Sequence, residues 1–232
     1  MKDDSDKSVY LSRLILNPHS RQVWSELSNP YEMHRTLLQA FPSVTDEKTK
    51  AREKFGVLYR ADMDDRRDRV IVYVQSYAKP DWSSINSHQD YLHEEVEPPN
   101  PAIKNITEIY RRFQNGRIFR FRLAANPSKR EPGRGKGRGR QGLLKQEDQI
   151  AWLKRKGESG GFRIIDMVVV PIGFQNSNKK DNKRHHGIKL FGVRFEGILS
   201  VTDPEIFKQT LISGIGSAKA FGFGLLSLAK IS

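Results

Sequence analysis

The chain has 232 residues and a formal net charge of +13, and it contains no cysteine. The lack of cysteine excludes disulfides, thiolate metal sites and a cysteine nucleophile. No apolar run approaches the roughly 18–20 residues that a membrane-spanning helix needs, and the acidic start of the chain lacks the pattern of a secretory signal. The composition therefore predicts a cytoplasmic protein.

The charge is unevenly distributed. Residues 1–110 carry 15 Lys and Arg against 18 Asp and Glu, a net charge of −3, whereas residues 111–232 carry 25 against 9, a net charge of +16. Such a basic half favours a polyanionic partner, because each Lys or Arg that meets a phosphate releases a condensed counterion. Nucleic acid is the first interpretation, and an anionic membrane surface is the alternative.

The first half of the chain shows a β-α-β-β order. Asn29-Pro30 has the pattern of an N-cap followed by the first helical residue, with Glu32 in the first turn. In the helix that follows, Met33, Leu37, Leu38 and Phe41 are expected to face the core. The predicted elements are a strand at 9–16, a short helix or turn at 20–28, a helix from 30 to about 41, strands at 54–61 and 69–77, a helical turn at 82–85, and an edge strand within 86–105.

The second half repeats this order of elements. Alternation of Ile118, Arg120 and Arg122 with Phe119 and Phe121 predicts a strand with one apolar face. The predicted elements are this strand at 116–124, a basic loop, a helix at 147–156, a strand at 163–171, a polar loop at 174–187, a strand at 188–201, a helix from 203 to about 213, and a last strand at 225–231.

The repeated order predicts an α+β protein with two tandem ferredoxin-like domains, each βαββαβ and RRM-like. We expect an N-terminal domain at 1–112, which carries the helix after Asn29, and a basic C-terminal domain at 113–232.

Tyr31 and His34 are the first candidates for chemistry. They lie one turn apart in the predicted helix and share a face. Cleavage of RNA by its own 2′-hydroxyl requires proton transfer and stabilisation of negative charge. An imidazole can transfer protons near neutrality, and a phenol can orient a hydroxyl or a phosphate oxygen. Without further context, the alternative is a packed tyrosine beside a surface histidine.

Candidate RNA-binding residues lie in two basic loops, on one strand and in a glycine-rich segment. Glycines let a backbone approach closely, and successive N–H groups can hold a phosphate, although a plain glycine-rich turn is an equal alternative. The candidates are Arg35, Arg120, Arg122, Lys129, Arg130, Arg138, Lys179, Lys180, Lys183, Arg184, Gly214, Gly216, Lys219, Gly222 and Gly224.

Neither a metal nor another cofactor is predicted. His185 and His186 have no acidic partners at ligand spacing. The acidic turn at 62–68 contains Arg66 and Arg67, which is typical of a solvated turn rather than a cation site.

Together these motifs resemble the CasE family, the CRISPR RNA-processing endoribonucleases of type I-E Cascade within the RAMP superfamily. Of the matching segments, the first two and the glycine-rich last one are the most specific to this family. The matching segments are YLSRLILNP (10–18), NPYEMHRTLLQAFP (29–42), FRFRLAANPSKR (119–130), QIAWLKRK (149–156), FEGILSVTDP (195–204) and GIGSAKAFGFGLLSLA (214–229).

The resemblance implies metal-independent cleavage of precursor crRNA at the 3′ base of the repeat hairpin by 2′-hydroxyl attack. Tyr31 and His34 match the catalytic pair of the family, with His34 transferring a proton to the leaving 5′-oxygen. Lys179 and Lys180 match a basic hairpin-binding loop. The implied partners are CRISPR repeat hairpin RNA, as precursor and mature crRNA, and other Cascade subunits, with no membrane or small-molecule cofactor. No lysine follows on the catalytic helix, so a third catalytic group is left open.

Three other functions fit the residues less well. A non-catalytic RNA-binding subunit of a CRISPR ribonucleoprotein would not depend on His34. A metal-dependent nuclease would lose its activity in EDTA. A DNA-binding architectural protein would not need a 2′-hydroxyl on its ligand.

Overall fold

Two units make up the chain in the computed structural model, which describes residues 8–44, 51–64, 66–86, 90–93, 99–130, 140–181 and 184–231. The first unit comprises Met1–Arg112 with two later segments, Ser177–His186 and Ala220–Gly222. The second unit comprises the remaining residues. Among the described residues, no helix combines the length and the apolar character that crossing a bilayer requires.

The first unit is built on a four-stranded antiparallel sheet in the order β2-β3-β1-β4. In this sheet Leu14 pairs with Val72, and Tyr59 pairs with Val74. The order is that of a βαββαβ ferredoxin-like unit. Its strands are β1 (Tyr10–Leu16), β2 (Leu58–Asp64), β3 (Arg69–Ser76) and β4 (Ala102–Asn105).

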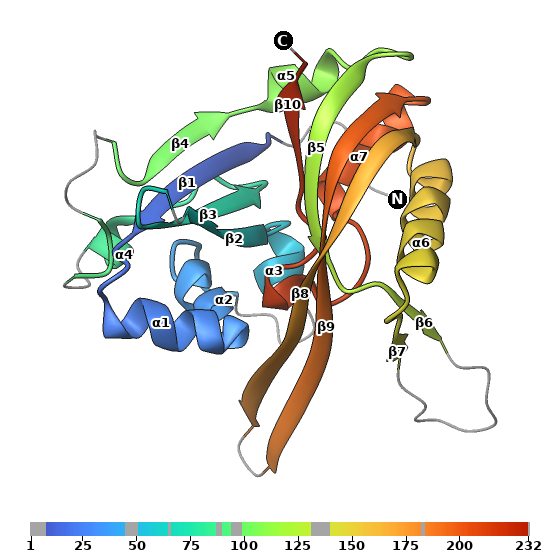
Figure 1. Ribbon diagram of the computed structural model, residues 1–232. Helices are drawn as coiled ribbons and strands as arrows, with labels where there is room; N and C mark the ends of the chain where they lie inside the picture. Colours follow the sequence, from blue (N-terminus) through green and yellow to red (C-terminus); the bar gives the residue numbers. More distant parts are fainter. Residues whose placement is uncertain are drawn as a thin grey trace. The chain divides into compact units, whose positions relative to one another are not determined.

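Two helices, α1 and α2, cover one face of this sheet (Figure 1). They bury Val23, Met33 and Leu37 against Leu14 and Val72 of the strands, and all five side chains are at most 1% exposed. Ser20 caps α1 by accepting a hydrogen bond from the Val23 backbone, as expected for a serine before a helix. The helices are α1 (Arg21–Ser28), α2 (Pro30–Leu38), α3 (Ala51–Lys54), α4 (Ser83–Asn86) and α5 (Thr107–Arg111).

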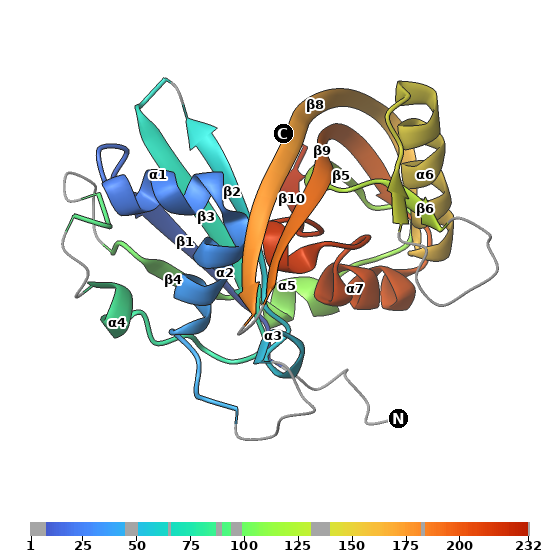
Figure 2. The ribbon, with the colours of Figure 1, turned by 90° about the horizontal axis from the view of Figure 1, so that it is seen from below.

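The second unit repeats the topology with its sheet in the order β10-β5-β9-β8. Helices α6 and α7 pack on one face of this sheet (Figure 2), where Trp152 stacks on Phe195 and Phe207 contacts Phe162. Asp203 caps α7 by accepting from two backbone N–H groups. The elements are β5 (Ile118–Ala125), β6 (Ser128–Arg130), β7 (Arg140–Gly142), α6 (Gln146–Ser159), β8 (Phe162–Asp181), β9 (Arg184–Val201), α7 (Pro204–Ser213), the 3-10 turn η2 (Lys219–Phe221) and β10 (Leu226–Lys230).

The predicted fold class of two ferredoxin-like units is confirmed, but two local predictions are wrong. Residues 174–187 were expected to form a loop, whereas the described part of this segment continues β8 to Asp181 and begins β9 at Arg184. The sequence of this segment is polar and carries no apolar alternation that would predict a strand. The strand expected from residue 54 begins at Leu58 instead, because Lys54 ends α3.

Candidate active site

Helix α2, which carries the candidate catalytic pair, begins as its sequence predicts. Pro30 occupies the first helical position and Glu32 lies in the first turn, although the Asn29 side chain makes no capping hydrogen bond. The Asn29 backbone carbonyl accepts the Glu32 N–H at 2.8 Å. Met33 and Leu37 are buried in the core, so the turn that carries Tyr31 and His34 is held firmly against the sheet.

Tyr31 and His34 lie next to each other on this helix. The centroids of their rings are 6.4 Å apart, with the rings inclined at 47°. Tyr31 also lies against Phe221, at 6.0 Å between centroids. The spacing in the sequence predicted that these two side chains share a face, and the structure has them there.

His34 is not the surface histidine that the sequence alone allowed. Only 6% of it is exposed, and its ring stacks on Tyr59 at 6.1 Å and 13°. Burial first, and then the positive charge of Arg52, lower its pKa from 6.5 to about 4. Its Nδ1 is buried and has no hydrogen-bond partner among the described residues. At neutral pH the free protein therefore carries a neutral imidazole at this position.

Sequence reasoning missed three residues at this site, namely Arg52 on α3, Tyr59 on β2, and Phe221. Arg52 is 23% exposed through its side chain and pairs with Glu53 at 3.0 Å. Tyr59 is 1% exposed. The strand alternation of β2 could have indicated that Tyr59 is buried, but its contact with His34 joins residues 25 positions apart and leaves no local pattern.

A buried carboxylate supports the catalytic helix from behind. Glu26 on α1 is 4% exposed. It accepts the Thr36 hydroxyl at 2.7 Å and the Tyr91 hydroxyl at 2.6 Å. Thr36 lies on α2, so this carboxylate ties α2 to α1 and to the segment at 90–93. Such a fully bonded polar group fixes one arrangement of the elements that it joins.

Arg35 lies on the exposed side of α2. Its guanidinium forms an i,i+3 ion pair with Glu32 at 2.9 Å, and its side chain is 65% exposed. An exposed pair of this kind adds little stability, so Arg35 is available to a phosphate.

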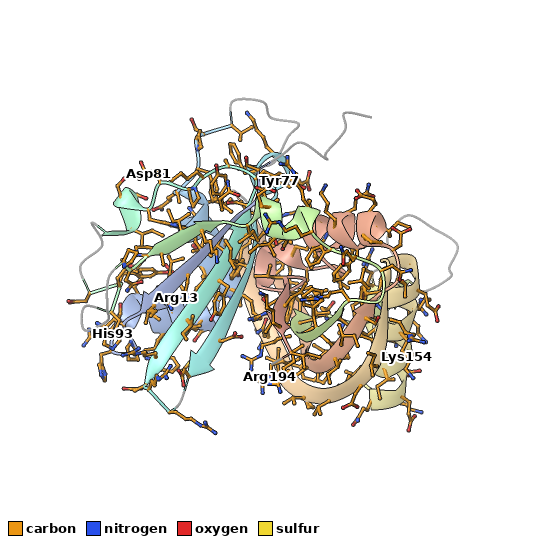
Figure 3. All side chains as sticks on the ribbon, turned by 90° about the horizontal axis from the view of Figure 1, so that it is seen from above. Arg13, Tyr77, Asp81, His93, Lys154 and Arg194 are labelled. Carbon is orange, nitrogen blue, oxygen red and sulfur yellow. The ribbon has the colours of Figure 1, made fainter. Side chains whose placement is uncertain are left out.

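Arg120 and Arg122 project from the face of β5 opposite its buried Phe121 and Leu123. Glu196 forms ion pairs with both arginines of this region, with its Oε1 2.8 Å from Nε of Arg122 and 2.9 Å from Nε of Arg194. Figure 3 labels Arg194 on this sheet. Arg194, like Glu196, was not among the predicted residues. The three guanidinium groups of Arg120, Arg122 and Arg194 outnumber the one carboxylate that pairs with two of them.

The first basic loop begins and ends in a short hairpin of β6 and β7. Lys129 pairs with Gln141 and Arg130 pairs with Arg140 across it. Arg138 lies outside the described residues.

The second basic segment belongs to the long hairpin rather than to a loop. Lys179 and Lys180 lie in β8 and Arg184 lies in β9, whereas Lys183 is outside the described residues.

The glycine-rich segment adopts the backbone conformation that glycine favours. Gly214, Gly216, Gly222 and Gly224 have φ between +76° and +93°. The Lys219 ammonium donates to the Ser213 carbonyl at the end of α7, where a positive charge is favourable. Gly222 approaches the ring of Tyr59, and a Cβ there would lie 3.3 Å from it.

Within the part of the chain that the structure describes, no three His, Asp or Glu side chains gather in a group that could hold a metal ion.

Comparisons with known proteins match the chain over nearly its whole length. A family model described as CRISPR associated protein matches residues 9–230. The chain is 36% identical to the CRISPR-associated endoribonuclease Cse3 of Thermus thermophilus, over 95% of this chain and 100% of that protein. It is 28% identical to the CRISPR system Cascade subunit CasE of Escherichia coli K12, over 96% of this chain and 100% of that protein.

A solved structure shows the same fold. Thermus thermophilus Cse3 bound to an RNA representing a pre-cleavage complex superposes with a TM-score of 0.71 at 34% identity, covering 96% of this chain and 99% of that one.

Proposed function

Because the chain belongs to the CasE/Cse3 family of CRISPR-associated endoribonucleases, we propose that it binds the stem-loop of CRISPR repeat RNA and cuts precursor crRNA at the 3′ base of the hairpin without a metal ion. The observation that carries this proposal is the pair of Tyr31 and His34, with rings 6.4 Å apart on a helix fixed against the core.

The proposed reaction is a transesterification within the RNA. The 2′-oxygen forms a bond to phosphorus and the bond from phosphorus to the 5′-oxygen breaks. The 2′-hydroxyl loses its proton to solvent water, and the leaving 5′-oxygen gains one from His34. The products are a 2′,3′-cyclic phosphate, which can open to a 3′-phosphate, and a 5′-hydroxyl. No metal is required where side chains move the protons and stabilise the charge.

His34 is assigned proton transfer to the leaving oxygen. Since its pKa in the free protein is about 4, the imidazole must gain its proton in the complex. A bound phosphodiester supplies a negative charge that favours the imidazolium. We therefore expect the pKa of His34 to rise when RNA binds. Tyr31, beside it, orients the 2′-hydroxyl or the scissile phosphate.

The basic residues of the second half and of the long hairpin are assigned to RNA binding. The deep, narrow major groove of an A-form stem exposes phosphates along its edges, which suits a projecting basic hairpin better than base reading. Lys179, Lys180 and Arg184 are the proposed contacts of the hairpin, and Arg120 and Arg122 those of the sheet face. We also propose that the protein keeps the processed RNA, sits as a subunit of a Cascade complex and acts in the cytoplasm.

The test is to incubate the protein with a labelled CRISPR repeat hairpin in EDTA and to analyse the product ends. Cleavage that yields a 5′-hydroxyl and a cyclic phosphate supports the proposal. Cleavage that needs magnesium would replace it with a metal-dependent nuclease. Tight binding without any cleavage would select the non-catalytic RNA-binding subunit.

A hairpin with a single 2′-deoxy nucleotide at the cut position separates binding from chemistry. We expect it to bind normally and to remain uncut, because the attacking oxygen is absent. If this RNA is cut, the 2′-hydroxyl is not the nucleophile.

A further inference from the structure

We propose that Tyr59 is a positioning residue of this active site, which holds the imidazole of His34 through its ring and the first turn of the catalytic helix through its hydroxyl. The inference rests on the proposed function of the Tyr31 and His34 pair and adds a residue from another part of the sequence to it.

The hydroxyl of Tyr59 reaches the helix at the carbonyl of Pro30, to which it donates a hydrogen bond of 2.6 Å. In an α-helix the carbonyl of residue 30 is also the acceptor for the N–H of residue 34. Tyr59 therefore bonds the same carbonyl that fixes the backbone of His34. Burial, and then the charge of Glu26, raise the pKa of the Tyr59 hydroxyl well above its ordinary value, so the hydroxyl stays a donor.

The ring of Tyr59 lies almost parallel to the imidazole, at 6.1 Å and 13°. Tyr59 itself is 1% exposed and is the second residue of β2, where its backbone pairs with Val74 of β3. A residue fixed by both its strand and its packing has little freedom to rotate. The imidazole, nearly parallel to the ring of Tyr59, is held in that orientation by this contact.

Four rings form a continuous series through the site. Tyr59 lies against His34, His34 lies 6.4 Å from Tyr31, and Tyr31 lies 6.0 Å from Phe221. Gly222 follows Phe221 and returns to the ring of Tyr59, with a φ of +79°. A larger residue at Gly222 would push on that ring. Tyr59 therefore contacts His34 directly and lies near Gly222, the neighbour of the Phe221 that contacts Tyr31.

This arrangement matters for proton transfer. The Nδ1 of His34 is buried and has no hydrogen-bond partner among the described residues. No hydrogen bond from these residues to Nδ1 therefore orients the imidazole. In many sites a carboxylate or a carbonyl bonds the second nitrogen and sets the ring. Here the contact with the ring of Tyr59 orients the imidazole instead.

The experiment compares Tyr59→Phe and Tyr59→Leu with Tyr110→Phe as the matched control. Tyr110 is also a buried tyrosine of the first unit, 8% exposed, and its hydroxyl bonds Gln75 at 2.7 Å. Tyr110→Phe removes a buried hydrogen bond similar to the one that Tyr59→Phe removes, but that bond does not involve α2. Three quantities are measured: the single-turnover rate of hairpin cleavage, the Kd for the uncut 2′-deoxy hairpin, and the pKa of His34 by NMR in the free protein.

We expect Tyr59→Leu to slow cleavage by about 10²-fold, the loss typical of a misplaced reacting group, with the Kd changed by less than about twofold. The pKa of His34 rises from about 4 toward 6.5, because water reaches the imidazole. Tyr59→Phe slows cleavage by about tenfold and leaves the pKa low, because the ring remains. Tyr110→Phe leaves all three quantities near those of the unmodified protein.

Wild-type cleavage rates in both Tyr59 variants would overturn the proposal. An equal loss in Tyr110→Phe at matched thermal stability would also overturn it, because the effect would then be general destabilisation. If Tyr59→Leu does not fold, Tyr59→Phe decides by its cleavage rate. If the unmodified protein cuts no hairpin, it is the proposed function that fails. The role of Tyr59 is then still tested by the pKa of His34, and an unchanged pKa in Tyr59→Leu would refute the proposed packing of Tyr59 on the imidazole.

Discussion

The two ferredoxin-like units share one strand order and differ in almost everything that bears on function. The first has its two main helices, α1 and α2, between its first two strands, and only the four-residue α4 between β3 and β4. The second has a full helix in each place, α6 with 14 residues and α7 with 10. Residues 1–110 carry a net charge of −3 and residues 111–232 a net charge of +16. The basic excess of residues 111–232 is shared between the units, because Ser177–His186 belongs to the first unit. We propose that the first unit frames Tyr31 and His34, and that the second unit and the long hairpin provide the cationic surface.

The comparison teaches that catalysis and RNA affinity should be separable in this protein. The candidate catalytic side chains are few and fixed by packing on one helix, so a single substitution there should abolish a rate. The basic side chains are many and spread over a surface, so each should contribute a small part of the binding free energy.

The largest expected effect is that of His34→Ala. We expect the single-turnover cleavage rate to fall by about 10³-fold, because the proton-transfer group is lost. The Kd for the hairpin should stay within about twofold, since the phosphate contacts are elsewhere. Tyr31→Phe, which keeps the ring and removes the hydroxyl, should give a smaller loss of rate. Undiminished cleavage by His34→Ala would show that the reaction takes place at another site.

Glu26→Ala tests whether the catalytic helix depends on the carboxylate behind it. The substitution removes the acceptor of two buried hydroxyls, those of Thr36 and Tyr91. We expect the free energy of unfolding of the first unit to fall by about 3 kcal/mol, measured by urea denaturation. Glu26→Gln keeps one acceptor oxygen and should cost less. An unfolding free energy in Glu26→Ala equal to that of the unmodified protein would show that this network does not hold the helix.

Replacing Lys179 and Lys180 together by alanine tests the cationic surface. We expect hairpin binding to weaken by about tenfold, and its salt dependence to flatten by about one counterion for each phosphate that is no longer neutralised. The bound RNA should still be cut at an unchanged rate. The control is Lys154→Ala with Arg155→Ala, two exposed residues of α6 whose replacement changes the net charge equally. If both double variants weaken hairpin binding equally, the effect comes from net charge alone and not from contacts of Lys179 and Lys180.

Arg52→Gln should have the smallest effect. Arg52 lowers the pKa of His34, second to burial, so its removal should raise that pKa by less than about one unit. The folded protein binds this proton less readily than the unfolded chain. The free energy of unfolding therefore decreases as the pH falls from 6.5 toward 4. Over this pH range the decrease should be smaller in Arg52→Gln than in the unmodified protein. NMR titration of His34 measures the shift, and an unmoved pKa would leave burial as its cause.

The sequence by itself determined the repeated order of elements, and with it the two sheets. Alternation at Arg120 and Arg122 placed β5, and Asn29-Pro30 with Glu32 placed the start of the catalytic helix. The sharing of one face by Tyr31 and His34 followed from helical spacing alone. These features depend on residues within a few positions of each other, where the backbone geometry fixes which side chains meet.

Tertiary structure alone decided the surroundings of His34. The stack on Tyr59, the influence of Arg52 and the approach of Gly222 join segments far apart in the chain, and none leaves a periodic signal. The same limit made residues 174–187 look like a loop, because their polar sequence has no apolar alternation. Burial and charge at a site are sums over all neighbours in space, whereas a sequence pattern records only the neighbours along the chain.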